Sequence, residues 1–181
     1  MTGWIWIAGV LAALLAALYC RVSYYGSPQV KLLFKGAASL AFVVLGLLCA
    51  GKAGASGYAA LMSLGLVLGA VGDVLLQWME CRPQNRDGLF RSGLGAFLAG
   101  HVFYIAAFML VMRTTFLQFA LAFALFAAMF ILQFPAKVEL GAQKAPVYAY
   151  AAVISLMAGY ALCGVFYAPQ LRTSLMLAGG L

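Results

Sequence analysis

The sequence predicts an all-α protein, a polytopic bundle of transmembrane helices, and two observations lead to that fold class. The chain of 181 residues is 66% hydrophobic and only 8% charged, whereas a soluble domain carries about a quarter charged residues. Its apolar runs are also around twenty residues long, which is the length that a helix needs to cross a bilayer. Within lipid only helices and closed barrels satisfy the backbone, and these runs are too long and too uniformly apolar for barrel strands.

The apolar runs predict six full spans within a single integral membrane domain over residues 1–181. The spans are expected at 4–19, 30–50, 57–79, 89–112, 115–134 and 145–167. Amphipathic rings favour the membrane interface, and five of them fall near span ends: Trp4, Trp6, Tyr19, Trp78 and Tyr167. Because the connections are short, successive helices are expected to be antiparallel neighbours. The longest polar connection, "ECRPQNRDGLFR" (80–91), has the composition of a turn-rich loop.

A seventh apolar stretch covers residues 174–181 at the end of the sequence. As a helix it would reach only about 12 Å, against a hydrocarbon core of about 30 Å. The pattern therefore predicts a truncated seventh span and a domain that is incomplete at its C-terminus. An interfacial tail is the alternative.

The distribution of basic residues predicts the orientation of the chain. The net charge is +7, but the Lys and Arg residues stand singly between apolar runs, which is typical of membrane loops and not of a nucleic-acid surface. The connections after spans one, three and five hold Arg21, Lys31, Arg82, Arg86, Arg91, Lys137 and Lys144. The other connections hold Lys52, Arg113 and Arg172. Since positive charge stays in the cytoplasm, the N-terminus is expected outside.

Asp73 is the most informative residue, because it lies within the apolar run of the third span. Gly65, Gly69, Asp73 and Gln77 recur every four residues and so share one helix face. An ionisable residue within a span is a functional candidate by default. Burial favours the neutral carboxylic acid, so Asp73 is a candidate proton donor. The alternative is a structural ion pair with a Lys or Arg.

The other polar candidates lie on neighbouring spans. On span four, Phe97, His101 and Tyr104 belong to one aromatic and polar face. Lys35, one turn inside span two, has three open interpretations: it extends to the interface, it pairs with Asp73, or it meets an anionic phosphate. Tyr150 on span six is by itself typical of a packing or interface residue.

Motifs of other catalytic classes are missing from the sequence. There is no G-x-S-x-G, no phosphate-binding glycine loop and no HExxH. The four cysteines form no CxxC pair, and one histidine without nearby carboxylates makes a poor metal site. We therefore expect no metal and no cofactor. Any catalysis should use acid–base chemistry with water.

Two segments carry a resemblance to a known family. "SLGLVLGAVGDVLLQ" (63–77) and "GLGAFLAGHVFYIAAF" (93–108) resemble the YhhN family of lysoplasmalogenase-like membrane proteins. That family joins a membrane GD motif to an F-x-x-x-H-x-x-Y helix, and the matching residues are Gly72, Asp73, Phe97, His101 and Tyr104. "VYAYAAVISLM" (147–157) is similar to a later family segment and includes Tyr150. Lys35 corresponds to a lysine of the family's second helix.

The resemblance implies an integral membrane enzyme of about eight helices. Its substrate would be a lysophospholipid, lysoplasmalogen, whose vinyl ether bond is cleaved to a fatty aldehyde and a glycerophospho-alcohol. Asp73 would be the acid–base residue, and His101 and Tyr104 would orient water or the vinyl ether. Lys35, Phe97 and Tyr150 would bind substrate. The resemblance also implies a second carboxyl group on a later helix, and "LMLAGGL" (175–181) is similar to the start of that segment.

Two other classes of function remain open from the residues alone. Intramembrane Asp, His and Lys also serve proton relays, so a proton-coupled transporter or a lipid flippase is one alternative. A non-catalytic scaffold is the other, in which the polar residues only hold helices together.

Overall fold

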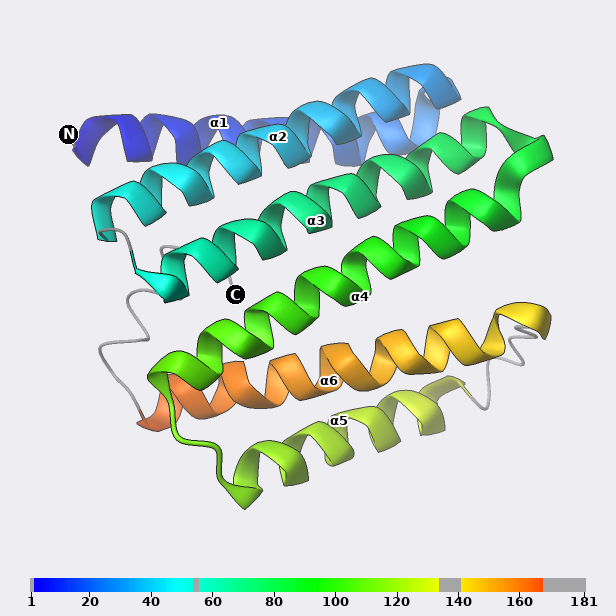
Figure 1. Ribbon diagram of the computed structural model, residues 1–181. Coiled ribbons are helices and arrows are strands. Elements are labelled where there is room, and N and C mark those ends of the chain that lie inside the picture. Colours follow the sequence, from blue (N-terminus) through cyan, green and yellow to red (C-terminus); the bar gives the residue numbers. More distant parts are fainter. Residues whose placement is uncertain (1, 54–55, 134–140, 168–181) are drawn as a thin grey trace.

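The computed structural model describes residues 2–53, 56–133 and 141–167 (Figure 1). Within these ranges the backbone is helical apart from short connections, and no strand is present. The elements are α1 (Thr2–Tyr25), α2 (Pro28–Ala53), α3 (Gly57–Cys81), the 3₁₀ turn η1 (Pro83–Asn85), α4 (Arg86–Val111), α5 (Phe116–Gln133), the 3₁₀ turn η2 (Gly141–Gln143) and α6 (Lys144–Tyr167). The expected all-α helix bundle is confirmed.

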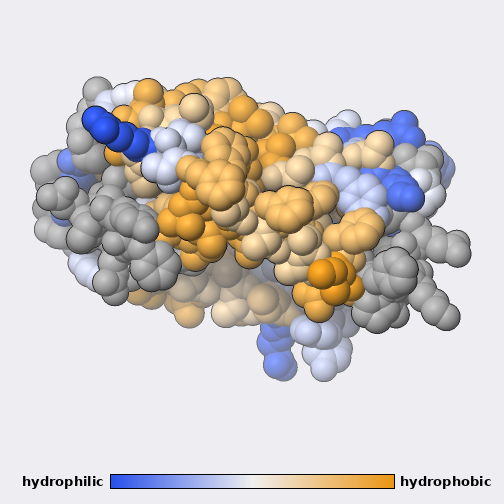
Figure 2. Space-filling view, turned by 90° about the horizontal axis from the view of Figure 1, so that it is seen from below, coloured by the Kyte–Doolittle hydropathy of each residue, from blue (hydrophilic) through white to orange (hydrophobic). Residues whose placement is uncertain are grey.

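Five of the described helices are long and apolar enough to cross a membrane, namely α1, α2, α3, α4 and α6. The span expected at 115–134 is the helix α5, whose described apolar part, Phe116–Leu132, is shorter than the others. In the space-filling view apolar side chains cover much of the middle of the molecule, and hydrophilic ones lie mostly toward its left and right ends, with a further group at the lower edge (Figure 2). The chain is thus an integral membrane protein. The seventh stretch expected at 174–181 lies outside the described residues.

The helices pack side by side in the order α1, α2, α3, α4, α6, α5 (Figure 1). The expectation that all successive helices are neighbours is wrong at one place, because α6 and not α5 packs on α4. The compositions of the two helices explain the exchange. Helix α5 is apolar almost throughout and loses nothing by facing lipid, whereas α6 carries Tyr150 and Tyr160, which find polar or ring partners inside, and Ser155, which is buried.

Helices α3 and α4 make the most extensive contact, and glycines permit it. A Cβ atom at Gly72 would stand 2.7 Å from Cδ2 of Phe97, and one at Gly100 would stand 3.0 Å from the carbonyl oxygen of Gly65. A Cβ at Gly65 would collide with the ring of Tyr104. These contacts place the glycine face of α3 directly against the aromatic face of α4.

The segment expected as a long polar loop at 80–91 is mostly helical, so that prediction is wrong. Helix α3 continues to Cys81 and α4 begins at Arg86, with only Arg82 and η1 between them. Pro83 is compatible with a first helical turn, where its missing N–H is not needed. The polar residues of this segment therefore extend two helices beyond their apolar parts instead of forming a loop.

A small buried core lies where α4 and α6 meet near the α4–α5 turn. The rings of Phe108 and Tyr160 stack with centroids 6.5 Å apart and an interplanar angle of 3°. The Tyr160 hydroxyl is 2.7 Å from Oγ1 of Thr114, so its polar end is satisfied. Gln118 is the third residue of α5, and its side-chain oxygen accepts a bond from the backbone N–H of Thr115 at 2.7 Å. A side chain at the third helical position that accepts a bond from the residue before the helix is one of the two bonds of a capping box, and it fixes the start of α5.

Candidate functional site

Asp73 is the centre of a polar cluster that joins α2 to α3. Its Oδ1 lies 2.8 Å from Nζ of Lys35, and its Oδ2 accepts a hydrogen bond of 2.7 Å from the Ser39 hydroxyl. Lys35 and Ser39 are four residues apart and so stand on one face of α2, opposite Asp73. Of the interpretations left open by the sequence, the structure shows the ion pair of Lys35 with Asp73. The two side chains are 27% and 29% exposed, so the pair is only partly buried.

Helix α1 adds a second layer to this cluster. Nζ of Lys35 lies 4.9 Å from the centroid of the Tyr19 ring, a cation–π contact. The Tyr19 hydroxyl donates a 2.8 Å hydrogen bond to Oε1 of Gln77, one turn along α3 from Asp73. The Nε2 atom of Gln77 is buried and has no hydrogen-bond partner among the described residues. The cluster therefore keeps one unused amide donor beside its ion pair.

His101 is held by its own helix and surrounded by rings. Its Nδ1 lies 2.6 Å from the carbonyl oxygen of Phe97, and since a carbonyl only accepts, Nδ1 carries the hydrogen. In the neutral ring Nε2 is then a hydrogen-bond acceptor. The ring meets Tyr104 edge-on at a centroid distance of 5.9 Å and Tyr150 edge-on at 5.4 Å. Tyr150 also contacts the ring of Phe97, with centroids 6.3 Å apart.

The polar cluster and the aromatic group adjoin along the contact of α3 with α4. Gly72 faces Phe97, whereas Gly100 faces the carbonyl oxygen of Gly65 and Cβ of Leu68, so the backbone of His101 lies roughly 10 Å along the α3 axis from Asp73. No hydrogen bond or ion pair joins Asp73 to His101 within the described part of the chain. Phe97 connects the two groups, because it faces Gly72, the neighbour of Asp73, and its ring contacts that of Tyr150.

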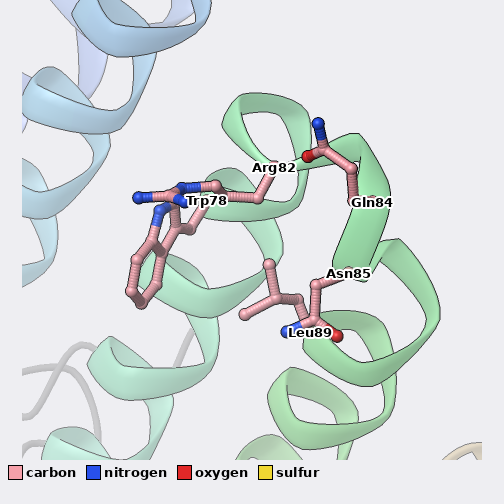
Figure 3. Close-up of a pocket in the computed structure, with 5 residues that line it drawn as sticks. All are labelled: Trp78, Arg82, Gln84, Asn85 and Leu89. Carbon is pink, nitrogen blue, oxygen red and sulfur yellow. The ribbon is translucent and has the colours of Figure 1, made fainter.

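The face of α3 between these groups is open. A Cβ atom added at Gly69 would meet nothing within 4 Å. Cavities lie at two of the described helix turns. One of about 410 Å³ lies at the α3–α4 turn (Figure 3) and one of about 510 Å³ at the α4–α5 turn, and neither is lined by Asp73, Lys35 or His101. In the described ranges no group of three His, Cys, Asp or Glu residues is placed to hold a metal ion.

The structure thus brings together all six candidate residues, in two adjoining groups: Lys35 and Asp73, and Phe97, His101, Tyr104 and Tyr150. Sequence reasoning missed the part played by Tyr19, which it assigned only to a span end. Gln77 was placed on the face of Asp73, but no partner could be inferred for it. No sequence pattern indicates the hydrogen bond between Tyr19 and Gln77, because it depends on how α1 packs across α2 and α3.

The fold and the site together define the class of the protein. It is a polytopic membrane protein whose helices hold an Asp–Lys pair, a histidine and three aromatic residues inside the spans. The chain belongs to the YhhN family, whose family model matches residues 30–181. The match includes every candidate residue from Lys35 to Tyr150 and begins after Tyr19. No curated protein and no solved structure matches the chain.

Proposed function

We propose that the protein is an intramembrane hydrolase that cleaves the vinyl ether bond of lysoplasmalogen or a related ether lysolipid. The observation that carries the proposal is the Asp73 carboxylate, held by Lys35 and Ser39 within a membrane helix that packs on the helix of His101, in a chain of the YhhN family. A vinyl ether needs one proton donor and one water molecule, and this cluster offers a carboxyl group and hydrogen-bonding side chains to position the water.

The reaction balances with one carboxyl group that acts twice. The neutral acid of Asp73 gives its proton to the vinyl carbon farther from the ether oxygen, and an oxocarbenium ion forms. Water adds to the cationic carbon and returns a proton to the Asp73 carboxylate, which yields a hemiacetal. The hemiacetal then breaks the bond between its carbon and the original ether oxygen. Its hydroxyl proton is passed to that oxygen, so that the products are a fatty aldehyde and a glycerophospho-alcohol. The carboxylate also stabilises the cation while it exists.

The contact with Lys35 links Asp73 to substrate binding. The ammonium group of Lys35 lies 2.8 Å from the Asp73 carboxylate. A bound lysophospholipid brings a phosphate, which competes with Asp73 for Lys35. When Lys35 turns to the phosphate, the carboxyl group is released from its ion pair and can meet the vinyl ether. Substrate binding would thereby prepare the proton donor.

The aromatic group supports the same reaction. With Nδ1 committed to the Phe97 carbonyl, Nε2 of His101 can accept a hydrogen bond from the attacking water. The hydroxyl of Tyr104 can donate to the water or to the ether oxygen. Phe97 and Tyr150 form an apolar wall against which the alkenyl chain packs.

A second candidate function has one observation in its favour. The Lys35–Asp73 pair and the Ser39 hydrogen bond join α2 to α3, which is what polar residues do when they only hold membrane helices together. A non-catalytic scaffold would use the cluster in this way. The two candidates differ in what the loss of Asp73 changes: turnover in the first and stability alone in the second.

The test is turnover of lysoplasmalogen by Asp73→Asn, followed as release of fatty aldehyde. Asn keeps the shape of Asp but neither gives nor takes the proton, and general acid–base catalysis is worth about 10²–10⁴-fold. We expect a fall of at least about a hundredfold. The control is Asp87→Asn, which changes the exposed aspartate in the first turn of α4 and should leave turnover unchanged. Unchanged turnover in Asp73→Asn would remove Asp73 from the mechanism.

We also infer that the N-terminus lies outside the cytoplasm and that the substrate approaches within the bilayer. The described basic residues gather at the end of the bundle formed by the α1–α2, α3–α4 and α5–α6 connections. The rule that positive charge stays inside assigns this end to the cytoplasm. Asp73 lies on the half of α3 nearer that end, and a lysolipid of the same leaflet could bring its vinyl ether to this depth.

A further inference from the structure

We propose that the cavity at the α3–α4 turn binds the phosphate-bearing headgroup of an anionic phospholipid, at a site separate from the Asp73 cluster. The cavity has a volume of about 410 Å³ and is lined by Trp78, Arg82, Gln84, Asn85 and Leu89 (Figure 3). This volume falls within the range of about 300–1,000 Å³ that is usual for small-ligand sites. None of the five residues belongs to the candidate catalytic groups.

The lining surface is mostly apolar, and its polar residues come from the turn between the two helices. Trp78 lies one turn before the end of α3 and Leu89 lies one turn inside α4, so both belong to the apolar parts of the two helices. Arg82, Gln84 and Asn85 lie beyond α3, in the short connection and η1. The glycerol–phosphate junction of a phospholipid has the same division, with the ester region toward the hydrocarbon and the phosphate toward water.

The charge of this end of the bundle favours an anion. Among the described residues it carries Arg21, Lys31, Arg82, Arg86, Arg91 and Lys144, against Glu80 and Asp87. Glu80 pairs with Lys31 at 3.4 Å. No ion pair is formed by the exposed guanidinium of Arg82 or by that of Arg86 within the part of the chain that the structure describes. The cavity thus has an unpaired arginine at its polar rim, and Arg is well suited to phosphate because its donors form a planar fork.

Trp78 adds a second reason to expect a lipid rather than a soluble anion. Its side chain is 40% exposed, and it stands one turn inside the helix end, at the depth where tryptophan rings meet headgroups. A soluble phosphate would contact Arg82 alone. An anionic phospholipid contacts Arg82 with its phosphate and packs the first part of its chains against Trp78 and Leu89.

The experiment measures quenching of Trp78 by brominated lipids. Replacing the exposed Trp4 and Trp6 by Phe leaves Trp78 as the one tryptophan of the chain, which has three. This parent protein is placed in phosphatidylcholine nanodiscs, and brominated phosphatidylglycerol or brominated phosphatidylcholine is added in increasing fractions. One arginine near the membrane surface is worth about fivefold in preference for an anionic lipid. Half-maximal quenching should therefore occur at about a fivefold lower fraction of the anionic lipid.

Matched variants locate the effect. Arg82→Gln should abolish most of the preference, Arg82→Lys should retain part of it, and Arg113→Gln, at the opposite end of the bundle, should leave it unchanged. Equal quenching by both lipids in the parent protein would overturn the proposal, and so would a preference that survives in Arg82→Gln. The parent protein is also measured in 1 M salt, which screens charge contacts. The preference for the anionic lipid should then disappear, and a preference that persists would contradict a contact between Arg82 and the lipid phosphate.

Discussion

At the scale of single residues, the ion pair of Lys35 and Asp73 is the feature with the greatest energetic consequence. The 2.8 Å contact stands on the apolar part of a membrane helix, where an isolated charge is costly. Each charge lowers the free-energy cost of placing the other in the membrane, and the Ser39 hydroxyl donates a hydrogen bond to the second carboxylate oxygen. The pair is nonetheless partly exposed, so that a phosphate or a proton can reach it.

A double-mutant cycle should detect this coupling. Lys35→Met leaves Asp73 without its cation, Asp73→Asn leaves Lys35 without its anion, and the double variant removes both charges. Exposed pairs couple by less than about 1 kcal/mol, and breaking a buried pair costs about 3–5 kcal/mol. For this partly buried pair we expect a coupling of about 1–3 kcal/mol, measured from thermal unfolding in detergent. Additive effects of the two substitutions would show that the pair contributes nothing to stability.

At the scale of elements, the contact of α3 with α4 sets the geometry of the site. The GD motif combines two functions at adjacent positions: Gly72 lets the Phe97 ring approach the backbone of α3, and Asp73 turns toward α2. Gly65 does the same for Tyr104. Close approach through small residues is the usual way in which membrane helices gain packing energy. The aromatic residues of α4 are thereby held at a fixed height relative to Asp73.

Gly72→Ala should separate the two helices, whereas Gly69→Ala should not. The new Cβ at position 72 would stand 2.7 Å from the Phe97 ring, and overpacking of this kind costs about 1–3 kcal/mol. At position 69 it meets nothing within 4 Å, so the midpoint of thermal unfolding should stay or rise slightly. Both variants are compared by thermal unfolding in the same detergent. A Gly72→Ala protein as stable as Gly69→Ala would contradict the close packing described for this pair.

At the scale of the whole molecule, charge distinguishes the two ends of the bundle. The end with the α1–α2, α3–α4 and α5–α6 connections holds most of the described Lys and Arg residues, and the opposite end holds Lys52 and Arg113. The middle presents apolar side chains outward (Figure 2). By the rule that positive charge stays inside, this asymmetry predicts that the N-terminus lies outside the cytoplasm.

Labelling from one side of the membrane tests that orientation. In a chain whose four cysteines (Cys20, Cys49, Cys81 and Cys163) are replaced by Ala or Ser, one new cysteine is introduced by Arg86→Cys or by Arg113→Cys. Both positions are exposed. A membrane-impermeant maleimide added to intact cells should label position 113 and spare position 86, and inverted vesicles should give the reverse result. Labelling of position 86 in intact cells would show that the N-terminus is cytoplasmic.

The sequence alone determined what depends on composition and spacing. Low charge and long apolar runs predict the membrane helices, because lipid admits few other structures. A four-residue recurrence places Gly65, Gly69, Asp73 and Gln77 on one face, since that spacing is a property of any α-helix. The six candidate site residues were identified in this way and from the family resemblance.

Only the tertiary structure decided what depends on how helices pack. It paired Asp73 with Lys35, brought Tyr19 to Gln77, and placed α6 between α4 and α5. It also replaced the expected loop at 80–91 by two helix ends with a cavity between them. Apart from the helix ends at 80–91, these features join residues distant in sequence, and their energies come from contacts between side chains across helices. Helical periodicity describes one helix at a time and carries no information about such contacts.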